Sequence, residues 1–405
     1  GGAMRGYGIP QAAFAAECMA DDLALALHMD PLEFRKKNCM RPGYVDPHTH
    51  VKCNTYGLAE CMEKGREFIR WDEKRREYEN QTGPVRKGIG MAIFCYKTGV
   101  YPISLETASC RMILNQDGSM QLQMGATEIG QGADTVFTQM AAEVTGITED
   151  KVNVLSTQDT DVSPFDTGAY ASRQTYVSGM AVKKTGAIFK EKILDYAAYM
   201  LEKPQDTLDV RDNHIVDKET GTQLLPMEEL ATTAFYSLDR SVHITAEATS
   251  HCKTNTFATG ACFAEVEVDM PLGKVKVTNI VNVHDSGKLI NPKLAAAQVH
   301  GGMSMGLGYG LSEELLFDAK GRPLNDNLLD YKLPTAMDTP DLNALFVELD
   351  DPTGPFGNKA LGEPPAIPVA PAVRNAVLNA TGVAVDSLPM DPQKMVKHFK
   401  EAELI

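Results

Sequence analysis

The chain has 405 residues, of which 43% are hydrophobic and 23% charged, an ordinary globular composition that excludes a disordered or collagen-like protein. Its formal charge of −15, from 39 basic and 54 acidic residues, argues against binding to a phosphate backbone, so we expect no nucleic-acid partner. This length exceeds the usual limit of a single hydrophobic core and predicts two or three domains or lobes.

The expected environment is the cytoplasm, with no membrane partner. The sequence contains no apolar run of membrane-spanning length and does not open on a signal peptide. None of the eight cysteines forms a C-x-x-C pair, which is typical of reduced thiols in a cytosolic protein. His48 and His50 could share a metal, but the adjacent Pro47 favours a surface turn, and we predict no metal ligand from the protein.

The N-terminal part reads as helical. Residues 11–40 predict helix, with a capping pattern that begins at Asp30. Residues 57–80 predict a charged amphipathic helix. The Gly- and Pro-containing segment 81–88 then predicts a boundary, so we expect residues 1–82 to form a helical segment. The opening "GGAMRGYGIPQ" has a glycine-rich motif already under way, which is typical of a piece of a longer protein or of one subunit of a split one.

Two later stretches repeat one order of elements. Residues 109–125 predict a hairpin, followed by a polar loop and a helix at about 133–144. Residues 261–285 predict a second hairpin, followed by a polar loop and a helix at about 295–311. We interpret this as an internal duplication and predict an α+β fold with two sheet-plus-helix lobes. The expected domains are residues 1–82, 83–255 and 256–405.

Three loop–helix junctions carry amide side chains. Gln131 lies in "GQG", Gln298 lies in "AAQVHGG", and "TGAYASRQTYVSG" (167–179) precedes a long helix. Free backbone amides at helix starts attract anions, and small residues let a ligand approach the backbone. Each junction alone is weak evidence, because most such helix entries are only tight turns. Together they predict one extended ligand with phosphate groups and hydrogen-bonding edges.

Other glycine patterns do not indicate a nucleotide site. No P-loop and no G-x-S-x-G elbow occurs, and "GIGMA" (88–92) lacks the third glycine of a dinucleotide fingerprint. Gly302, Gly306 and Gly310 follow each other at i,i+4 spacing, which predicts close helix packing.

A single acid stands in "KALGEPPA", residues 359–366. Glu363 is the only charged residue between Lys359 and Arg374, and Pro364 should hold it in an extended conformation. A solvated loop charge and a positioned general base are both compatible with this octapeptide. A helix that begins near Pro371 would support the segment from behind.

Five motifs in this order, across essentially the whole chain, closely resemble the molybdenum hydroxylases, the xanthine dehydrogenase and aldehyde oxidase family. They are "MRGYGIPQ", "GATEIGQG", "GAYASRQTYVSG", "AAQVHGGMSMGLGYGLSEEL" and "KALGEPP". The resemblance covers only the C-terminal part of that family's molybdopterin-binding region. It implies the fold of that cofactor-binding domain, and an enzyme that hydroxylates a purine or a related N-heterocycle with oxygen from water.

The resemblance also implies the site. Glu363 matches the catalytic glutamate, and Tyr7 stands where xanthine-type enzymes stack a phenylalanine on the substrate. Gln131 and Gln298 match glutamines that bind the pterin, and Ala169 matches an alanine close to the metal. The full set of implied cofactor-binding residues is Arg5, Gln131, Gly132, Ala169, Ser172, Arg173, Gln174 and Gln298.

The implied cofactor is molybdenum–molybdopterin in its cytosine dinucleotide form, because "YASRQ" resembles the stretch that bacterial members use on the dinucleotide tail. The family's upstream "GGxFGGK" loop is absent, and so are the iron–sulfur and flavin modules. We therefore expect an upstream molybdopterin-binding half, and 2Fe-2S clusters and FAD on partner subunits or domains.

Elementary chemistry agrees with the assigned base. Hydroxylating a heterocycle or an aldehyde at carbon requires an oxygen nucleophile, which one base makes by removing a proton from a metal-bound hydroxyl. A different class of function stays open: a cofactor-binding or assembly module, or an aldehyde-oxidising member, whose partner chain carries the reactive chemistry. The intact Glu363 favours the catalytic interpretation, since a scaffold does not need a base there.

Overall fold

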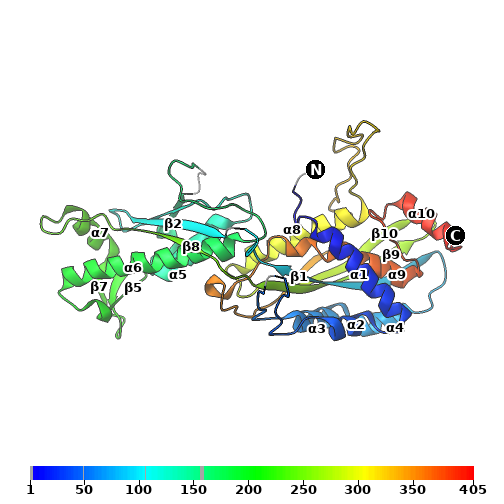
Figure 1. The fold of residues 1–405 in the computed structure, drawn as a ribbon, viewed down its shortest axis with the longest axis horizontal. Coiled ribbons are helices and arrows are strands. Elements are labelled where there is room, and N and C mark those ends of the chain that lie inside the picture. Colours follow the sequence, from blue (N-terminus) through cyan, green and yellow to red (C-terminus); the bar gives the residue numbers. More distant parts are fainter. Residues whose placement is uncertain (1–2, 49, 105, 156–158) are drawn as a thin grey trace. The chain divides into compact units, whose positions relative to one another are not determined.

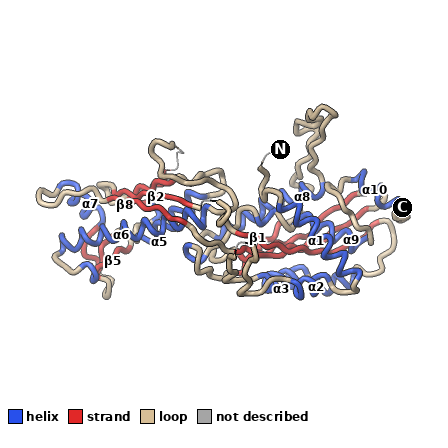
Figure 2. The backbone as a smooth tube through the Cα atoms, viewed as in Figure 1, coloured by secondary structure: helices blue, strands red, loops and turns tan. Residues whose placement is uncertain are grey.

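The computed structural model describes residues 3–48, 50–104, 106–155 and 159–405. The chain divides into two units, which are described separately. Unit 1 comprises Gly1–Lys97, Phe257–Asp350 and Ala360–Ile405, and unit 2 comprises Thr98–Thr256 and Asp351–Lys359. Both contain helices and sheets (Figure 1; Figure 2), which confirms the α+β class.

Unit 1 is built on a sheet whose described strands run in the order β1-β9-β10-β11. The strands are β1 (Val85–Lys97), β9 (Phe257–Asp269), β10 (Lys274–Asp285) and β11 (Leu342–Val347). The sequence alternates only weakly along β9, and nearly all of that strand is buried. A strand buried on both faces is expected where helices cover both sides of a sheet.

The helices of unit 1 cover both faces of its sheet. They are α1 (Ile9–Ala26), α2 (Pro31–Asn38), α3 (Leu58–Ile69), α4 (Trp71–Glu77), α8 (Pro292–Leu311), α9 (Val369–Thr381) and α10 (Pro392–Glu401). One core lies between the sheet and α8, α9 and α10, with residues such as Val266, Met303 and Val373. A second core lies on the opposite face, where Trp71 meets Phe263 edge to face with ring centroids 5.6 Å apart.

Unit 2 contains a sheet in the order β4-β3-β2-β8 and a smaller one in the order β5-β6-β7, as far as the chain is described. The larger sheet consists of β2 (Thr107–Leu114), β3 (Met120–Met124), β4 (Val152–Leu155) and β8 (Thr245–His251). The smaller consists of β5 (Leu208–Arg211), β6 (His214–Asp217) and β7 (Gln223–Pro226). The helices are α5 (Ala133–Thr145), α6 (Gly179–Leu201) and α7 (Met227–Tyr236).

The two main sheets share one topology. In unit 1 an antiparallel hairpin, β9–β10, leads into α8 and then into β11, which lies parallel to β10. In unit 2 the hairpin β2–β3 leads into α5 and then into β4, which lies parallel to β3. The fourth strand, β1 or β8, pairs antiparallel with the first strand of the hairpin. Both predicted hairpins and their following helices are confirmed, and the shared topology supports the proposed duplication.

The N-terminal helices differ from the prediction in their continuity. The helix expected at 57–80 is interrupted at Arg70, whose φ of 60° lies in the left-handed region, and so becomes α3 and α4. The segment expected at 11–40 becomes α1 and α2. Asp30 caps α2 as predicted, since its carboxylate accepts from the backbone amides of Leu32 and Glu33 at 2.9 and 3.2 Å.

The units divide the chain differently from the expected domains. The expected boundary at 255/256 lies beside the transition from Thr256 to Phe257. No transition between units occurs at 82/83 in the described chain, because β1 pairs with β9 along its full length, from Val85 to Lys97. The helical segment 1–82 therefore belongs to the same unit as the second predicted lobe.

Candidate functional site

Glu363 stands at a tight turn between a loop and a helix. It precedes a 3-10 turn, Pro364–Ala366, and its carbonyl accepts from the amide of Ala366 at 3.2 Å. Its backbone is helical, with φ −90° and ψ −35°, so the extended conformation predicted from Pro364 is wrong. Closure of the 3-10 turn outweighs the steric preference that the following proline imposes.

Two side chains hold the backbone on either side of Glu363. The Arg5 guanidinium donates from Nε to the Gly362 carbonyl at 2.5 Å. The Asn282 amide donates from Nδ2 to the Pro365 carbonyl at 3.1 Å. The lone acid is therefore clamped by donors from the N-terminal segment and from β10, and it is half-buried. Sequence analysis missed Asn282, because no local pattern distinguishes it from other polar strand residues.

Glycines on α8 allow the clamp to form. A Cβ atom at Gly302 would lie 2.4 Å from the Cβ of Pro365, and one at Gly306 would lie 2.5 Å from the Cβ of Val369. Real Cβ atoms do not approach so closely, so only glycine lets the proline turn rest against the helix. The predicted packing role of this glycine row is confirmed.

Arg5 joins Glu363 to a predicted cofactor residue. Its Nη2 donates to the backbone carbonyl of Gln298 at 3.0 Å and to the side-chain Oε1 at 3.4 Å. With Oε1 engaged, the Nε2 hydrogens of Gln298 are the part of that side chain suited to a ligand acceptor. Burial lowers the pKa of Arg5, and the nearby Glu363 carboxylate partly offsets that effect. Unit 1 thus brings together three of the predicted site residues: Arg5, Gln298 and Glu363.

Glu363 also receives a hydrogen bond that sequence analysis missed. The phenol of Tyr96, near the end of β1, donates to Oε2 of Glu363. Tyr96 is 5% exposed and packs in a small buried cluster with Phe94, Ala258 and Ile367. The period-2 alternation of β1 could have placed Tyr96 on the same face as Phe94, but not opposite an acid far away in the chain.

A buried histidine lies beside this cluster. His284 on β10 is 0% exposed, and its ring centroid is 5.0 Å from that of Phe94. Neither ring nitrogen has a hydrogen-bond partner among the described residues. Burial, and then the charge of Arg5, lower the pKa of His284 to about 3. The imidazole is therefore neutral near pH 7 and adds no charge to the site.

This burial predicts a pH-dependent stability. The imidazole of His284 ordinarily titrates at 6.5 but at about 3 in the fold, so the unfolded chain binds the extra proton between these values. The contribution of His284 is complete above pH 6.5 and is lost as the pH falls toward 3, with a slope of at most about 1.4 kcal/mol per pH unit. Urea unfolding of the parent and of His284→Leu at pH 7, 6 and 5 should show the parent losing stability more steeply. Parallel curves would contradict this assignment.

Tyr7 occupies an exposed and strained turn. Its φ is 44°, between Gly6 and Gly8, which also have positive φ values, and its amide donates to the Met4 carbonyl at 2.7 Å. The ring is 78% exposed, so Tyr7 is not a core anchor in this structure. A non-glycine residue in the left-handed region is uncommon and marks a position for functional tests.

In unit 2 the predicted residues Gln131 and Gln174 lie together. Gln131 donates from Nε2 to Gln174 Oε1 at 2.7 Å and to the Thr127 carbonyl at 2.8 Å. Gln174 donates to the same Thr127 carbonyl at 3.0 Å. The two amides therefore hold the loop that precedes α5, and Gln131 also accepts from the Ile129 amide at 2.7 Å.

The carboxylate of Glu128 lies at the start of α5, where the sequence predicted a site for an anionic ligand. The carboxylate of Glu128 accepts from the amides of Gly130, Gly132 and Asp134 at 2.7 to 3.1 Å. Burial acts to raise the pKa of Glu128, but these donated hydrogen bonds outweigh it and lower the pKa. Gly132 is a predicted cofactor residue whose amide donates to Glu128, and its contact with the cofactor stays a prediction. Sequence analysis missed Glu128, although an acid just before a helix is a known start signal.

Arg173 is a core residue. Its side chain is 0% exposed and donates to Glu106 at 2.5 Å, to Asp166 at 2.6 Å and to the Gly168 carbonyl at 2.9 Å. It therefore organises the segment 168–174 from inside. Arg173 is a positioning residue for its neighbours.

The other two predicted residues of this segment lie nearer the surface. Ala169 is exposed, and Ser172 is half-buried in a left-handed turn with φ 51°. Their proposed contacts with the cofactor stay predictions.

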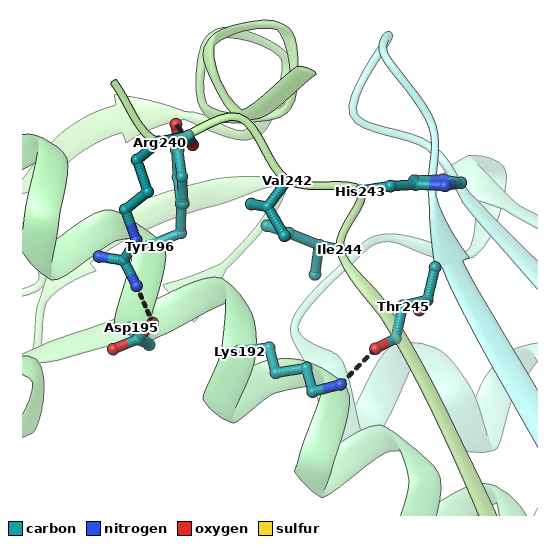
Figure 3. Close-up of a pocket in the computed structure, with 8 residues that line it drawn as sticks. All are labelled: Lys192, Asp195, Tyr196, Arg240, Val242, His243, Ile244 and Thr245. Atoms are coloured by element: carbon teal, nitrogen blue, oxygen red, sulfur yellow. Dashed lines mark hydrogen bonds and ion pairs between the residues drawn. The ribbon is translucent and has the colours of Figure 1, made fainter. Parts of the chain in front are cut away.

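A pocket of about 270 Å³ also lies in unit 2, between α6 and the segment 240–245 (Figure 3). Its charged side chains are already engaged: Arg240 pairs with Asp195 at 2.5 Å, and Lys192 donates to the Thr245 carbonyl at 2.7 Å. Of the described residues that line it, none is a predicted site residue. We therefore assign no ligand-binding role to this pocket.

Within the described ranges, no three His, Cys, Asp or Glu side chains lie together in an arrangement that could hold a metal ion. Over the same residues, every helix is too short or too polar to cross a bilayer.

Comparison with known families identifies the class. A model described as "Molybdopterin cofactor-binding domain" matches residues 64–340, and a second model with the same description matches residues 1–39. The chain therefore belongs to the molybdopterin cofactor-binding domain family, and its resemblance to the molybdenum hydroxylases is confirmed.

Individual relatives show which enzymes of this family are similar to the chain. The chain is 49% identical over its whole length to the putative xanthine dehydrogenase molybdenum-binding subunit XdhA of Escherichia coli K12, of which it covers 54%. Over 98% of its length it is 32% identical to the probable hypoxanthine oxidase XdhD of the same strain, of which it covers 42%. Its fold matches the reconstituted CO dehydrogenase from Oligotropha carboxidovorans with a TM-score of 0.90 at 26% identity, covering 100% of this chain and 53% of that one. The chain thus spans about half the length of the curated relatives it matches.

Proposed function

We propose that this chain is the molybdopterin-binding catalytic portion of a xanthine dehydrogenase-like hydroxylase that acts on a purine or a related N-heterocycle. The observation that carries the proposal is the clamp around Glu363: Tyr96 donates to its carboxylate, and Arg5 and Asn282 hold the backbone carbonyls of the neighbouring residues. An acid held by donors from three distant segments is suited to proton transfer, because a general base must be fixed within reach of the proton it takes.

The residues around Glu363 in unit 1 are suited to a pterin-type cofactor. Gln298 turns its Oε1 toward Arg5, which leaves amide hydrogens for a ligand acceptor. When bound, the cofactor would supply the acceptor for two electrons and the oxygen derived from water. Glu363 would take the proton that this oxygen loses as it bonds to the substrate carbon. The proposed cofactor contacts are Arg5, Gln131, Gly132, Ala169, Ser172, Gln174 and Gln298, with Arg173 supporting the loop.

We further propose the cytosine dinucleotide form of the cofactor, and partner subunits or domains that carry 2Fe-2S clusters and FAD. The name of one relative supports partners in general, because it describes a "molybdenum-binding subunit". A cytoplasmic location, the absence of a membrane partner and the domain roles of the two units belong to the same proposal.

The proposal is tested on the assembled enzyme. Elemental analysis should find molybdenum, mass spectrometry of the released cofactor should find a pterin dinucleotide, and the enzyme should oxidise xanthine or hypoxanthine. A protein that holds only iron or zinc would contradict the cofactor. Turnover of aldehydes but not purines would assign it to the aldehyde-oxidising branch, and molybdenum without any turnover would favour an assembly module.

Tyr7 gives a separate test of substrate binding. Tyr7→Ala in the assembled enzyme should raise KM and lower kcat/KM by roughly 1–2 kcal/mol, about 5- to 30-fold, through lost stacking. The melting temperature should not change, because the ring is 78% exposed. Steady-state kinetics at equal molybdenum content measures the effect. Loss of cofactor or of folding in Tyr7→Ala would show a structural role.

A further inference from the structure

We propose that Tyr96 is a positioning residue for Glu363, one that aligns its carboxylate and sets how readily the carboxylate takes a proton. The inference rests on the proposed role of Glu363 as the base. A glutamate carboxylate rotates over a broad range about its last torsion, so backbone clamping alone does not orient its oxygens. The hydrogen bond from the Tyr96 phenol to Oε2 supplies that missing constraint.

The strand makes Tyr96 a rigid donor. In the register of the sheet, Tyr96 lies opposite Ala258 on β9, and Phe94 lies opposite Gly260. A Cβ at Gly260 would lie only 2.5 Å from the Phe94 ring, so the layer formed by the Phe94 and Tyr96 rings packs directly against the sheet. Tyr96 is 5% exposed within this layer. Its ring has little room to rotate, and the phenol keeps one direction.

The charged and titratable groups near the Glu363 turn include Arg5, His284 and Tyr96. Arg5 from the N-terminal segment acts on Glu363 by charge and holds the preceding carbonyl. From β10, His284 faces Arg5 and is neutral above about pH 3. Tyr96 from β1 donates directly to the carboxylate. A hydrogen bond to the charged form of an acid stabilises that form, so its loss makes protonation easier.

The test is Tyr96→Phe in the assembled enzyme, with Tyr78→Phe as the matched control. Tyr78 also donates its phenol to a glutamate, Glu265, in the same unit and away from the site. We expect Tyr96→Phe to lower kcat about 10-fold with little change in KM, and to move the acid limb of the pH–rate profile upward by about half to one pH unit. Tyr78→Phe should affect only the melting temperature.

Fluorinated tyrosine gives a second measurement that preserves the fold. 3-Fluorotyrosine at position 96 keeps the ring and strengthens the phenol as a donor, so the acid limb should move downward, opposite to Tyr96→Phe. A pH profile that is the same in all three proteins would overturn the proposal, and so would a loss of molybdenum in Tyr96→Phe beyond that in Tyr78→Phe. If Glu363→Gln is inactive while Tyr96→Phe is unchanged, this inference fails and the proposed function stands. If Glu363→Gln stays active, the proposed function itself fails.

Discussion

Glu363→Gln should reduce turnover by at least the roughly 10²–10⁴-fold that a positioned base contributes. Glutamine keeps the shape of the side chain and removes its basicity. The clamp from Arg5 and Asn282 binds the backbone of the neighbouring residues, so it survives the substitution. Molybdenum content and melting temperature should therefore remain near those of the parent. The decisive measurement is kcat at matched molybdenum occupancy.

Glu313→Gln is a suitable control, because Glu313 also accepts a tyrosine phenol, that of Tyr331, in the same unit. It should leave kcat unchanged. A Glu363→Gln enzyme that keeps more than about a tenth of parental activity would be too active for the loss of a general base. Glu363 would then be an ordinary loop charge.

Arg173→Met should lower the free energy of unfolding by about 3–5 kcal/mol, because it leaves the buried Glu106 and Asp166 without their shared cation. For a unit of this size that corresponds to a fall in melting temperature of about 10 °C. Thermal unfolding by circular dichroism measures it. The triple substitution that adds Glu106→Gln and Asp166→Asn should recover part of the loss, since it removes the unpaired charges.

The matched control is Arg111→Met. Arg111 pairs with Glu247 at 2.7 Å, but the two side chains are 37% and 50% exposed, so the substitution should cost less than about 1 kcal/mol. A normal melting temperature for Arg173→Met, combined with loss of the cofactor, would contradict the core role and return Arg173 to the direct ligand contacts.

The sequence predicted the elements whose signals are local. The cap at Asp30, both hairpins and the helices that follow them depend on turn chemistry and on periodicity within about twenty residues. Glu363 stands out because a charge isolated between glycine and proline is unusual, but its role as a general base is implied by the family resemblance and not by this local pattern. The break at Arg70 was missed because the amphipathic pattern continues across it, and only the backbone conformation shows the end of α3.

The surroundings of Glu363 could not be predicted in the same way. Its phenol donor lies 267 residues earlier, and the guanidinium on the preceding carbonyl lies 357 residues from that carbonyl. No local pattern specifies such pairs, since sheet register and helix packing bring them together. Arg173 combines both cases: Asp166 lies only seven residues before it, but Glu106, the other acid that it contacts, lies 67 residues earlier.

The hydrogen bonds that join the two ends of the segment 98–256 have a consequence for the order in which the chain folds. Thr98 donates its amide to the Thr256 carbonyl at 2.9 Å, and Asn255 donates its side-chain amide to the Thr98 carbonyl at 2.9 Å. These bonds join the two ends of the long segment between β1 and β9. Closing that segment as a flexible loop would cost more entropy than closing it when it is already folded. We therefore expect residues 98–256 to fold first and then to place Lys97 and Phe257 side by side, so that the pairing of β1 with β9 can proceed from that end.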